Sequence, residues 1–214
     1  AMAIAETTLV SNSSGSNATS YTTASITPTA NELILVAIAH QAATTAETVA
    51  PTLTGNSLTY VEIVSILYPN DSGVRRLSLF RAMGASPTAQ AITIDFAGNT
   101  QLRCRWSVSD ISGTDTSGTN GSGAIAQQPT ARGSGAATLT VTLVAFGSVD
   151  NGAFVAFSLG DNQAITPDTG WTEEADIQIG AEAQQLETQF RADNDTSAVA
   201  TWATNTTHGG IAVE

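Results

Sequence analysis

Hydrophobic and polar residues alternate along much of this chain with the period of a β-strand. Successive side chains of a strand point to opposite faces of a sheet, so alternation predicts a strand with one buried and one solvent-facing side. The clearest case is residues 102–108, whose apolar face carries Leu102, Cys104, Trp106 and Val108. Further strands are predicted at residues 58–66, 74–82, 91–96, 138–143, 171–179, 186–192, 198–203 and 210–214.

Residues 33–39 and 153–159 break this alternation because they are apolar at nearly every position. A strand that is apolar on both faces must be covered on both faces. In a two-layer protein, the outer cover comes from a loop, a short helix or another subunit. The pattern leaves two alternatives open, a cover within the chain and a subunit interface.

Clusters of Ser, Thr, Asn, Asp and Gly separate the predicted strands, and these residue types favour turns. The clusters lie at residues 11–20, 54–57, 69–73 and 112–123. Short strands between such turns predict an all-β fold, a two-sheet antiparallel β-sandwich that is jelly-roll-like and has about 10–12 strands. We expect residues 1–214 to form a single domain, with 112–123 as a long Gly/Ser/Thr loop. Residues 181–189 have a helix-forming composition, but the alternation at 186, 188 and 190 favours a strand.

The charge of the chain disfavours nucleic acid and anionic membranes as partners. The 214 residues include 19 acidic and 7 basic residues, which gives a formal net charge of −12, and every basic residue is arginine. An acidic chain repels phosphate, and no basic cluster is present to release counterions. With 42% hydrophobic and only 12% charged residues, the chain is expected to fold rather than to remain disordered.

The sequence shows no catalytic constellation. A Ser/His/Asp hydrolase needs an imidazole, which only His40 and His208 provide, and no G-x-S-x-G motif surrounds a serine. His40 follows an apolar strand and His208 precedes two glycines, so we interpret both as strand-end residues. One cysteine and two distant histidines also lack the spacing of zinc ligands. We therefore expect a non-enzymatic protein. A hydrolase is retained as the least favoured hypothesis.

Two groups of acidic residues were considered as sites. Asp193 and Asp195 flank an asparagine, and three oxygen-bearing side chains in one turn are ligands that calcium prefers. The same residues also suit a hairpin turn without an ion. Residues 173, 174 and 176 are carboxylates that would form a glycosidase pair only if two of them converged on a cleft. Otherwise they are solvated positions of a strand.

Sugar binding is the runner-up function. Small β-sandwiches often present aromatic rings that stack on sugars, and the candidate carbohydrate-binding residues are Trp171, Trp202, Tyr60 and Tyr68, with Tyr21 as a further aromatic. The alternative is that each large ring fills the core, as aromatic side chains usually do. If the sugar hypothesis is correct, these rings must expose a face to solvent.

Five phrases of the sequence resemble a loose group of uncharacterised β-sandwich proteins from tailed bacteriophages and environmental sequences. They are Ser-Tyr-Thr-Thr at 20–23, Ile-Thr-Pro-Thr-Ala-Asn-Glu-Leu-Ile-Leu at 26–35, Leu-Phe-Arg-Ala at 79–82, Arg-Ala-Asp-Asn-Asp-Thr at 191–196 and Gly-Gly-Ile-Ala-Val-Glu at 209–214. The resemblance covers nearly the whole chain. It implies a jelly-roll-like module of a phage particle and carries over no catalytic residue.

The sequence therefore predicts a non-enzymatic structural module of a phage particle, such as a capsid decoration or a tail-associated protein. We expect a homo-oligomer or binding to other virion proteins, and a location on the virion or outside the cell. The alternative is a carbohydrate-binding module or adhesin domain. No cofactor is expected apart from the calcium ion considered at Asp193 and Asp195.

Overall fold

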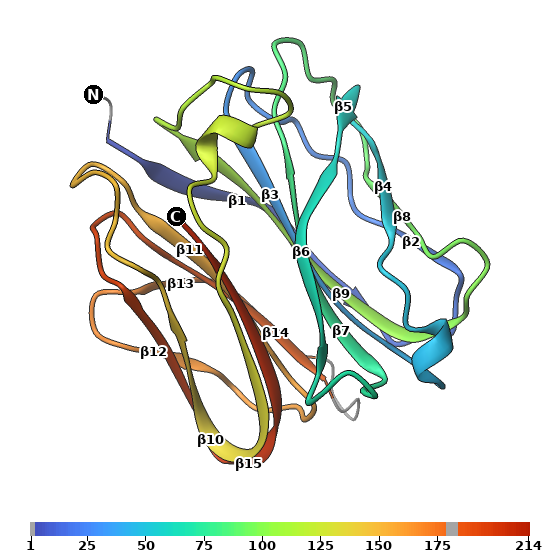
Figure 1. Cartoon of the computed structure of the whole chain (residues 1–214). Coiled ribbons are helices and arrows are strands. Elements are labelled where there is room, and N and C mark those ends of the chain that lie inside the picture. The colour runs from blue at the N-terminus through green and yellow to red at the C-terminus, as the bar shows by residue number, and fades with distance from the viewer. Residues whose placement is uncertain (1–2, 179–183) are drawn as a thin grey trace.

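The computed structural model describes residues 3–178 and 184–214, and in this part of the chain it contains antiparallel strands and two short 3-10 turns (Figure 1). The all-β sandwich prediction is confirmed. The described residues form fifteen strands rather than about 10–12. No helix among them is long and apolar enough to cross a membrane.

The N-terminal half of the chain forms the first large sheet, in the order β1-β9-β3-β7-β6. Its strands are β1 (Ala5–Ser14), β3 (Leu33–Ala42), β6 (Val61–Tyr68), β7 (Arg75–Ala82) and β9 (Gln101–Ser112). β1 overlaps residues 11–20, which were predicted to be a turn. β1 pairs in register with β9, for example Asn12 with Trp106. This long-range pairing gives the backbone of these polar residues its hydrogen bonds, so they form an edge strand rather than a turn.

The C-terminal half forms the second large sheet, in the order β10-β15-β11-β14-β13, with β12 (Thr166–Pro167) paired to β15. Its other strands are β10 (Thr130–Thr142), β11 (Ala153–Leu159), β13 (Thr172–Gln178), β14 (Gln185–Arg191) and β15 (Ser197–Val213). The strands predicted at 198–203 and 210–214 are thus two parts of one strand. β14 confirms the strand predicted at 186–192 except for its last residue, whereas residues 179–183 lie outside the described residues.

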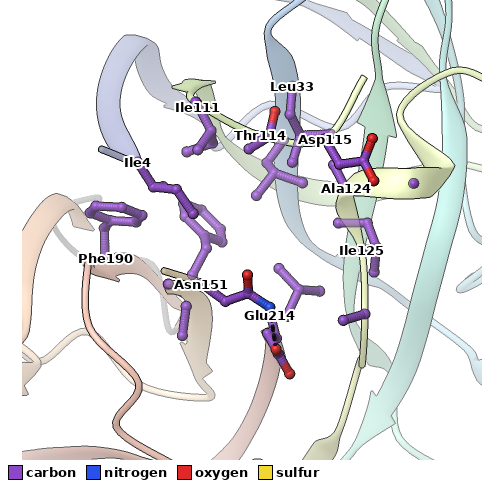
Figure 2. A pocket seen from close by; sticks show the side chains of 18 of the residues that line it. Ile4, Leu33, Ile111, Thr114, Asp115, Ala124, Ile125, Asn151, Phe190 and Glu214 are labelled. Atoms are coloured by element: carbon purple, nitrogen blue, oxygen red, sulfur yellow. Dashed lines mark hydrogen bonds between the residues drawn. The ribbon is translucent and has the colours of Figure 1, made fainter. Parts of the chain in front are cut away.

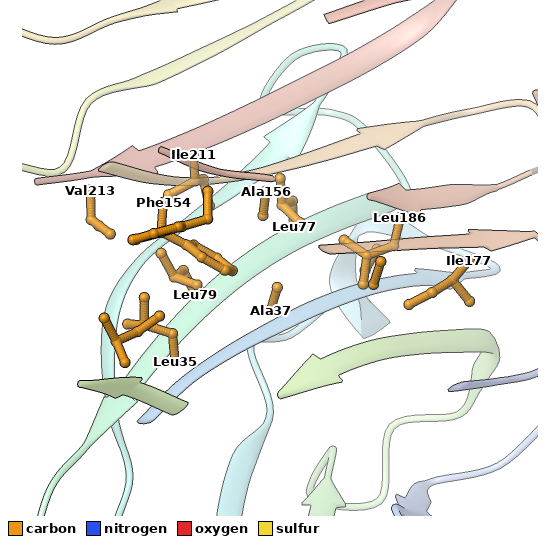
Figure 3. Close-up of a cluster of buried hydrophobic side chains, with 14 of the residues drawn as sticks. Leu35, Ala37, Leu77, Leu79, Phe154, Ala156, Ile177, Leu186, Ile211 and Val213 are labelled. Atoms are coloured by element: carbon orange, nitrogen blue, oxygen red, sulfur yellow. The ribbon is translucent and has the colours of Figure 1, made fainter. Parts of the chain in front are cut away.

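The two large sheets face each other and share one hydrophobic core (Figure 3). Leu35 and Ala37 of β3 and Leu77 and Leu79 of β7 lie in this core. Opposite them lie side chains of the second sheet, Phe154, Ala156, Ile177, Leu186, Ile211 and Val213. Because the strands of this core come from both halves of the chain, each half buries its inner face only against the other.

A small third sheet covers the outer face of the first sheet, in the order β2-β8-β4-β5. Its strands are β2 (Ser20–Thr22), β8 (Thr93–Asp95), β4 (Thr52–Gly55) and β5 (Leu58–Thr59). Ile92, Ile94 and Phe96 are fully buried as the alternation of residues 91–96 predicted. They pack with Ile34, Val36 and Ile38, which are the β3 side chains that point away from the shared core.

The ribbon of β10 and β15 folds back over the outer face of the second sheet. Leu139 pairs in register with Ala200, yet it also lies beside Gly210, ten residues further along β15. A Cβ on Gly210 would be 3.1 Å from the Leu139 side chain and 2.7 Å from Val141. Glycine at this position therefore permits the close approach of the folded ribbon.

The small sheet and the folded ribbon decide between a cover within the chain and a subunit interface for the two apolar segments. β3 is enclosed by the small sheet on one side and the second sheet on the other. β11 is enclosed by the first sheet and by the folded β10–β15 ribbon, whose buried residues include Ala198 and Trp202. Both covers are formed within the chain, so neither apolar strand needs a subunit to bury it.

Candidate functional site

Both histidines lie inside the fold and each bonds to a neutral group. His40, near the end of β3, is fully buried, and its Nδ1 lies 2.7 Å from the amide oxygen of Gln101. Burial lowers the pKa of His40 to about 3, although the hydrogen bond to Gln101 opposes this shift and Arg76 adds to it. Nδ1 of His208 lies 3.0 Å from the carbonyl oxygen of Thr206, and burial also lowers the pKa of His208. Both imidazoles are therefore neutral parts of the interior at pH 7.

The aromatic residues proposed to bind sugars are mostly part of the core. Trp171 and Trp202 belong to the cluster beneath the folded ribbon, where their Nε1 atoms donate to the carbonyl oxygens of Ser197 and Ala136. Tyr68 is fully buried between the large sheets, and its hydroxyl lies 2.6 Å from Oγ of Ser158. A ring that stacks on a sugar must expose one face, so these three rings match the alternative in which large aromatic side chains fill the core.

Tyr60 and Tyr21 do not restore an aromatic platform. Tyr60 is half-buried, and its hydroxyl donates to Oδ1 of Asn56 at 2.9 Å. The ring of Tyr21 is buried against Phe96 and Trp106. The alternation of residues 102–108 placed Trp106 in the core, and the structure confirms this position. The candidate rings are thus distributed over separate clusters and do not form a common surface.

The carboxylates considered for calcium are bound to an arginine. Nη1 of Arg191 donates to Asp195 at 2.7 Å, and Nε and Nη2 of Arg191 donate to both oxygens of Asp193. The second oxygen of Asp195 accepts from the N–H of Ser197 at 2.9 Å. A positive side chain thus occupies the place that the sequence interpretation gave to a cation. Among the described residues, no group of three His, Cys, Asp or Glu side chains is arranged to hold a metal ion.

The carboxylates considered as a glycosidase pair point to different neighbours. A bulge lies between Glu173 and Ala175, and Glu174 is hydrogen bonded to Glu6 of β1. Burial, followed by the Glu6 carboxyl, raises the pKa of Glu174 to about 8. Asp176 instead accepts from the side chain of Gln185 on β14. Glu174 therefore lies apart from the other two, whereas burial, followed by the Glu173 carboxylate, raises the pKa of Asp176 to about 6.

A buried carboxyl that the sequence did not single out lies opposite Asp176. Glu187 of β14 pairs in register with Asp176 and is fully buried. Burial raises the pKa of Glu187 to about 9; a hydrogen bond from Gln189 lowers it, whereas the Asp176 and Glu173 carboxylates raise it further. Glu187 therefore carries a proton at pH 7. This carboxyl stabilises the fold best in its neutral form.

A pocket with a volume of about 330 Å³ lies between the two large sheets, at the end where β9 and β15 finish (Figure 2). Its apolar floor comes from Leu33, Leu35 and Ile111 of the first sheet and from Phe154, Phe190 and Val213 of the second. Figure 2 shows Ile4 and Phe190 on one side of the space and Ala124 and Ile125 on the other. The loop that joins the two sheets thus forms a wall of the pocket.

The polar part of the wall is built around the Glu214 side chain. Its carboxylate accepts from Nδ2 of Asn151 at 2.6 Å, from the N–H of Gly147 at 2.9 Å and from the side chain of Gln127. Burial acts to raise the pKa of Glu214, but the hydrogen bonds from Gln127, Asn151 and Gly147 outweigh it and lower the pKa. The wall therefore carries a fixed negative charge at neutral pH.

The remaining polar groups of the pocket add acceptors and negative charge. Oγ1 of Thr114 is buried in the wall and has no hydrogen-bond partner among the described residues. Asp115 and Asp150 are exposed residues of the lining, and the described residues that line the pocket include no basic side chain. Such a site favours an apolar group with a positive or hydrogen-bond-donating end, and it disfavours an anion.

No feature of the sequence indicates this pocket. Its residues come from the start of β3, the end of β9, the loop after β9, the start of β11 and the end of β15. Residues 33–39, 153–159, 186–192 and 210–214 were predicted as strands and 112–123 as a loop, but not as walls of one cavity. No local pattern signals a cavity whose walls come from segments far apart in sequence.

Comparison of the chain with protein families, with characterised proteins and with solved structures found no match.

Proposed function

We propose that this chain is a non-enzymatic structural module of a phage particle, such as a capsid decoration or a tail-associated protein. The resemblance of residues 20–23, 26–35, 79–82, 191–196 and 209–214 to phage β-sandwich proteins suggests this role. The proposed location is the virion or the extracellular medium. The proposed partners are further copies of the chain or other virion proteins.

The observation that carries the proposal is where the chain places its chemically reactive side chains. His40, Cys104 and Glu187 are fully buried, and His208 is nearly so. Each of them contributes to interior packing or hydrogen bonding. Their burial supports a role that the chain performs through its surface, as a structural module does.

The surface and the layers of the fold also suit a particle outside the cell. A lysine-free chain with a net charge of −12 resists non-specific association. Both apolar strands are enclosed by the chain itself, so proteases and solvent meet mainly polar strands. Contacts with other virion proteins would accordingly use surfaces other than β3 and β11.

Binding to particles tests the proposal. The purified chain is added to phage particles that lack its gene, and the mixture is separated on a density gradient. We expect the chain to move with the particles and to reach a fixed number of copies on each particle. The chain after heat denaturation serves as the control. A chain that stays at the top of the gradient at every concentration would contradict the proposal, and capsid or tail genes beside its own gene would support it.

A further inference from the structure

We propose that the pocket between the two large sheets binds a small amphiphile with an apolar body and a cationic ammonium head group. This inference is independent of the role on a phage particle. The shape of the pocket, the charges of its wall and two exposed apolar residues of the adjoining loop support it.

The apolar body is indicated by the floor of the pocket. Leu35, Phe154 and Phe190 come from both sheets and surround a space of about 330 Å³. This volume is at the lower end of the range of small-molecule pockets, about 300–1,000 Å³. An alkyl chain or one ring placed there would gain about 25 cal/mol for each Å² of apolar surface removed from water.

The cationic head is indicated by the wall. The Glu214 carboxylate is held in place by three donors, and Asp115 and Asp150 add two exposed carboxylates. Oγ1 of Thr114 is a buried hydroxyl that can accept from or donate to a ligand, and it has no partner among the described residues. An ammonium group carries donors and a positive charge, so it matches these groups, whereas a carboxylate head would be repelled.

Two exposed apolar residues of the adjoining loop, outside the lining of the pocket, suit the same ligand. Val144 and Val149 are large hydrophobic side chains that are 71% and 79% exposed. Val149 directly precedes Asp150 and Asn151 of the pocket, and Val144 is bonded through its backbone to Gln127, which also donates to Glu214. Apolar residues beside a charged wall suit a ligand that has both characters.

Three ligands of equal chain length separate the contribution of the head group from that of the tail. Isothermal titration calorimetry at pH 7 compares octylammonium, octanol and octanoate as probes. We expect octylammonium to bind about tenfold more tightly than octanol, and octanoate to bind at least tenfold more weakly than octanol. The preference for octylammonium should decrease at high salt. Equal binding of octylammonium and octanoate, or no heat from any of the three at millimolar concentration, would overturn the proposal.

Two variants locate the binding. Asp150→Asn removes an exposed charge of the rim, so octylammonium affinity should fall about two- to fivefold while octanol affinity stays unchanged. Asp161→Asn is the matched control, because Asp161 is an exposed turn carboxylate outside the pocket, and it should change neither affinity. Ala124→Phe places a ring toward the floor and should abolish binding of both ligands, provided that its circular dichroism spectrum matches wild type. Unchanged binding in both pocket variants would place the ligand elsewhere and refute the assignment.

Discussion

The buried Glu187 carboxyl makes a specific prediction about how stability depends on pH. In the folded protein the pKa of Glu187 is about 9, against 4.5 for an unperturbed glutamate. Between these values the unfolded chain releases this proton while the folded chain keeps it. Since the unfolded state then binds fewer protons, the free energy of unfolding falls as pH rises through this window. The contribution is about 1.4 kcal/mol for each pH unit.

Glu187→Gln should remove this pH dependence without changing the shape of the side chain. The amide oxygen of glutamine can accept the hydrogen bond that Nε2 of Gln189 donates to Glu187 at 2.7 Å. Glutamine also has no proton to lose, so the stability of the variant relative to wild type should increase as pH rises. From pH 6 to pH 8, the difference in unfolding free energy between variant and wild type should grow by about 2–3 kcal/mol in favour of the variant.

Urea titrations at pH 6, 7 and 8, followed by tryptophan fluorescence, measure this difference. Subtracting wild type from variant at each pH cancels the titration of Glu174 and of the two histidines. Asp161→Asn, in an exposed turn, is the control and should show a constant difference from wild type. A constant difference for Glu187→Gln as well would mean that Glu187 is ionised in the folded protein, and the reasoning would be refuted.

Three further predictions follow from the packing. Gly210→Ala should destabilise the protein by about 1–3 kcal/mol in urea unfolding, because the added Cβ would lie 2.7 Å from the Val141 side chain. Gly147→Ala is the control. Its Cβ would lie 3.9 Å from the Glu214 side chain, so stability should change by less than about 0.5 kcal/mol. The Cys104 thiol is fully buried, and burial raises the pKa of this thiol. Ellman's reagent should therefore label Cys104 only in urea. Rapid labelling of the native protein would disprove the burial of Cys104. Adding calcium or a chelator should leave the melting temperature unchanged, because Arg191 binds both aspartates of the turn; a calcium-dependent rise would restore the metal hypothesis.

The sequence predicted the strands well where the apolar positions alternate. The apolar faces of residues 91–96 and 138–143 are buried as expected, since alternation is a local property of the chain. The opposite face of β9 could not be predicted. Arg105 and Ser107 were expected in solvent, yet both are fully buried because the second sheet lies over them. There Arg105 donates to the side chain of Gln184 at 2.9 Å.

The candidate sites were less predictable than the strands. Tryptophan fits either a core or an exposed surface, and only the folded-back ribbon decides that Trp171 and Trp202 are buried. The Asp193–Asp195 turn was recognised as acidic, but the arginine that neutralises it was not. The pocket depends on how two sheets from different halves of the chain meet at one end. Such features arise from long-range packing, which residue periodicity does not report.

The division of the two large sheets between the halves of the chain has a consequence for synthesis on the ribosome. The first sheet can complete its hydrogen bonding once Ser112 has emerged, but the face that carries Leu35 and Leu77 has no partner until β11 and β15 follow. At about 5–20 residues per second, translation leaves this face uncovered for several seconds. Aggregation therefore competes with folding while only the N-terminal half of the chain has been synthesised. Truncated products that end before β11 should require chaperones to stay in solution.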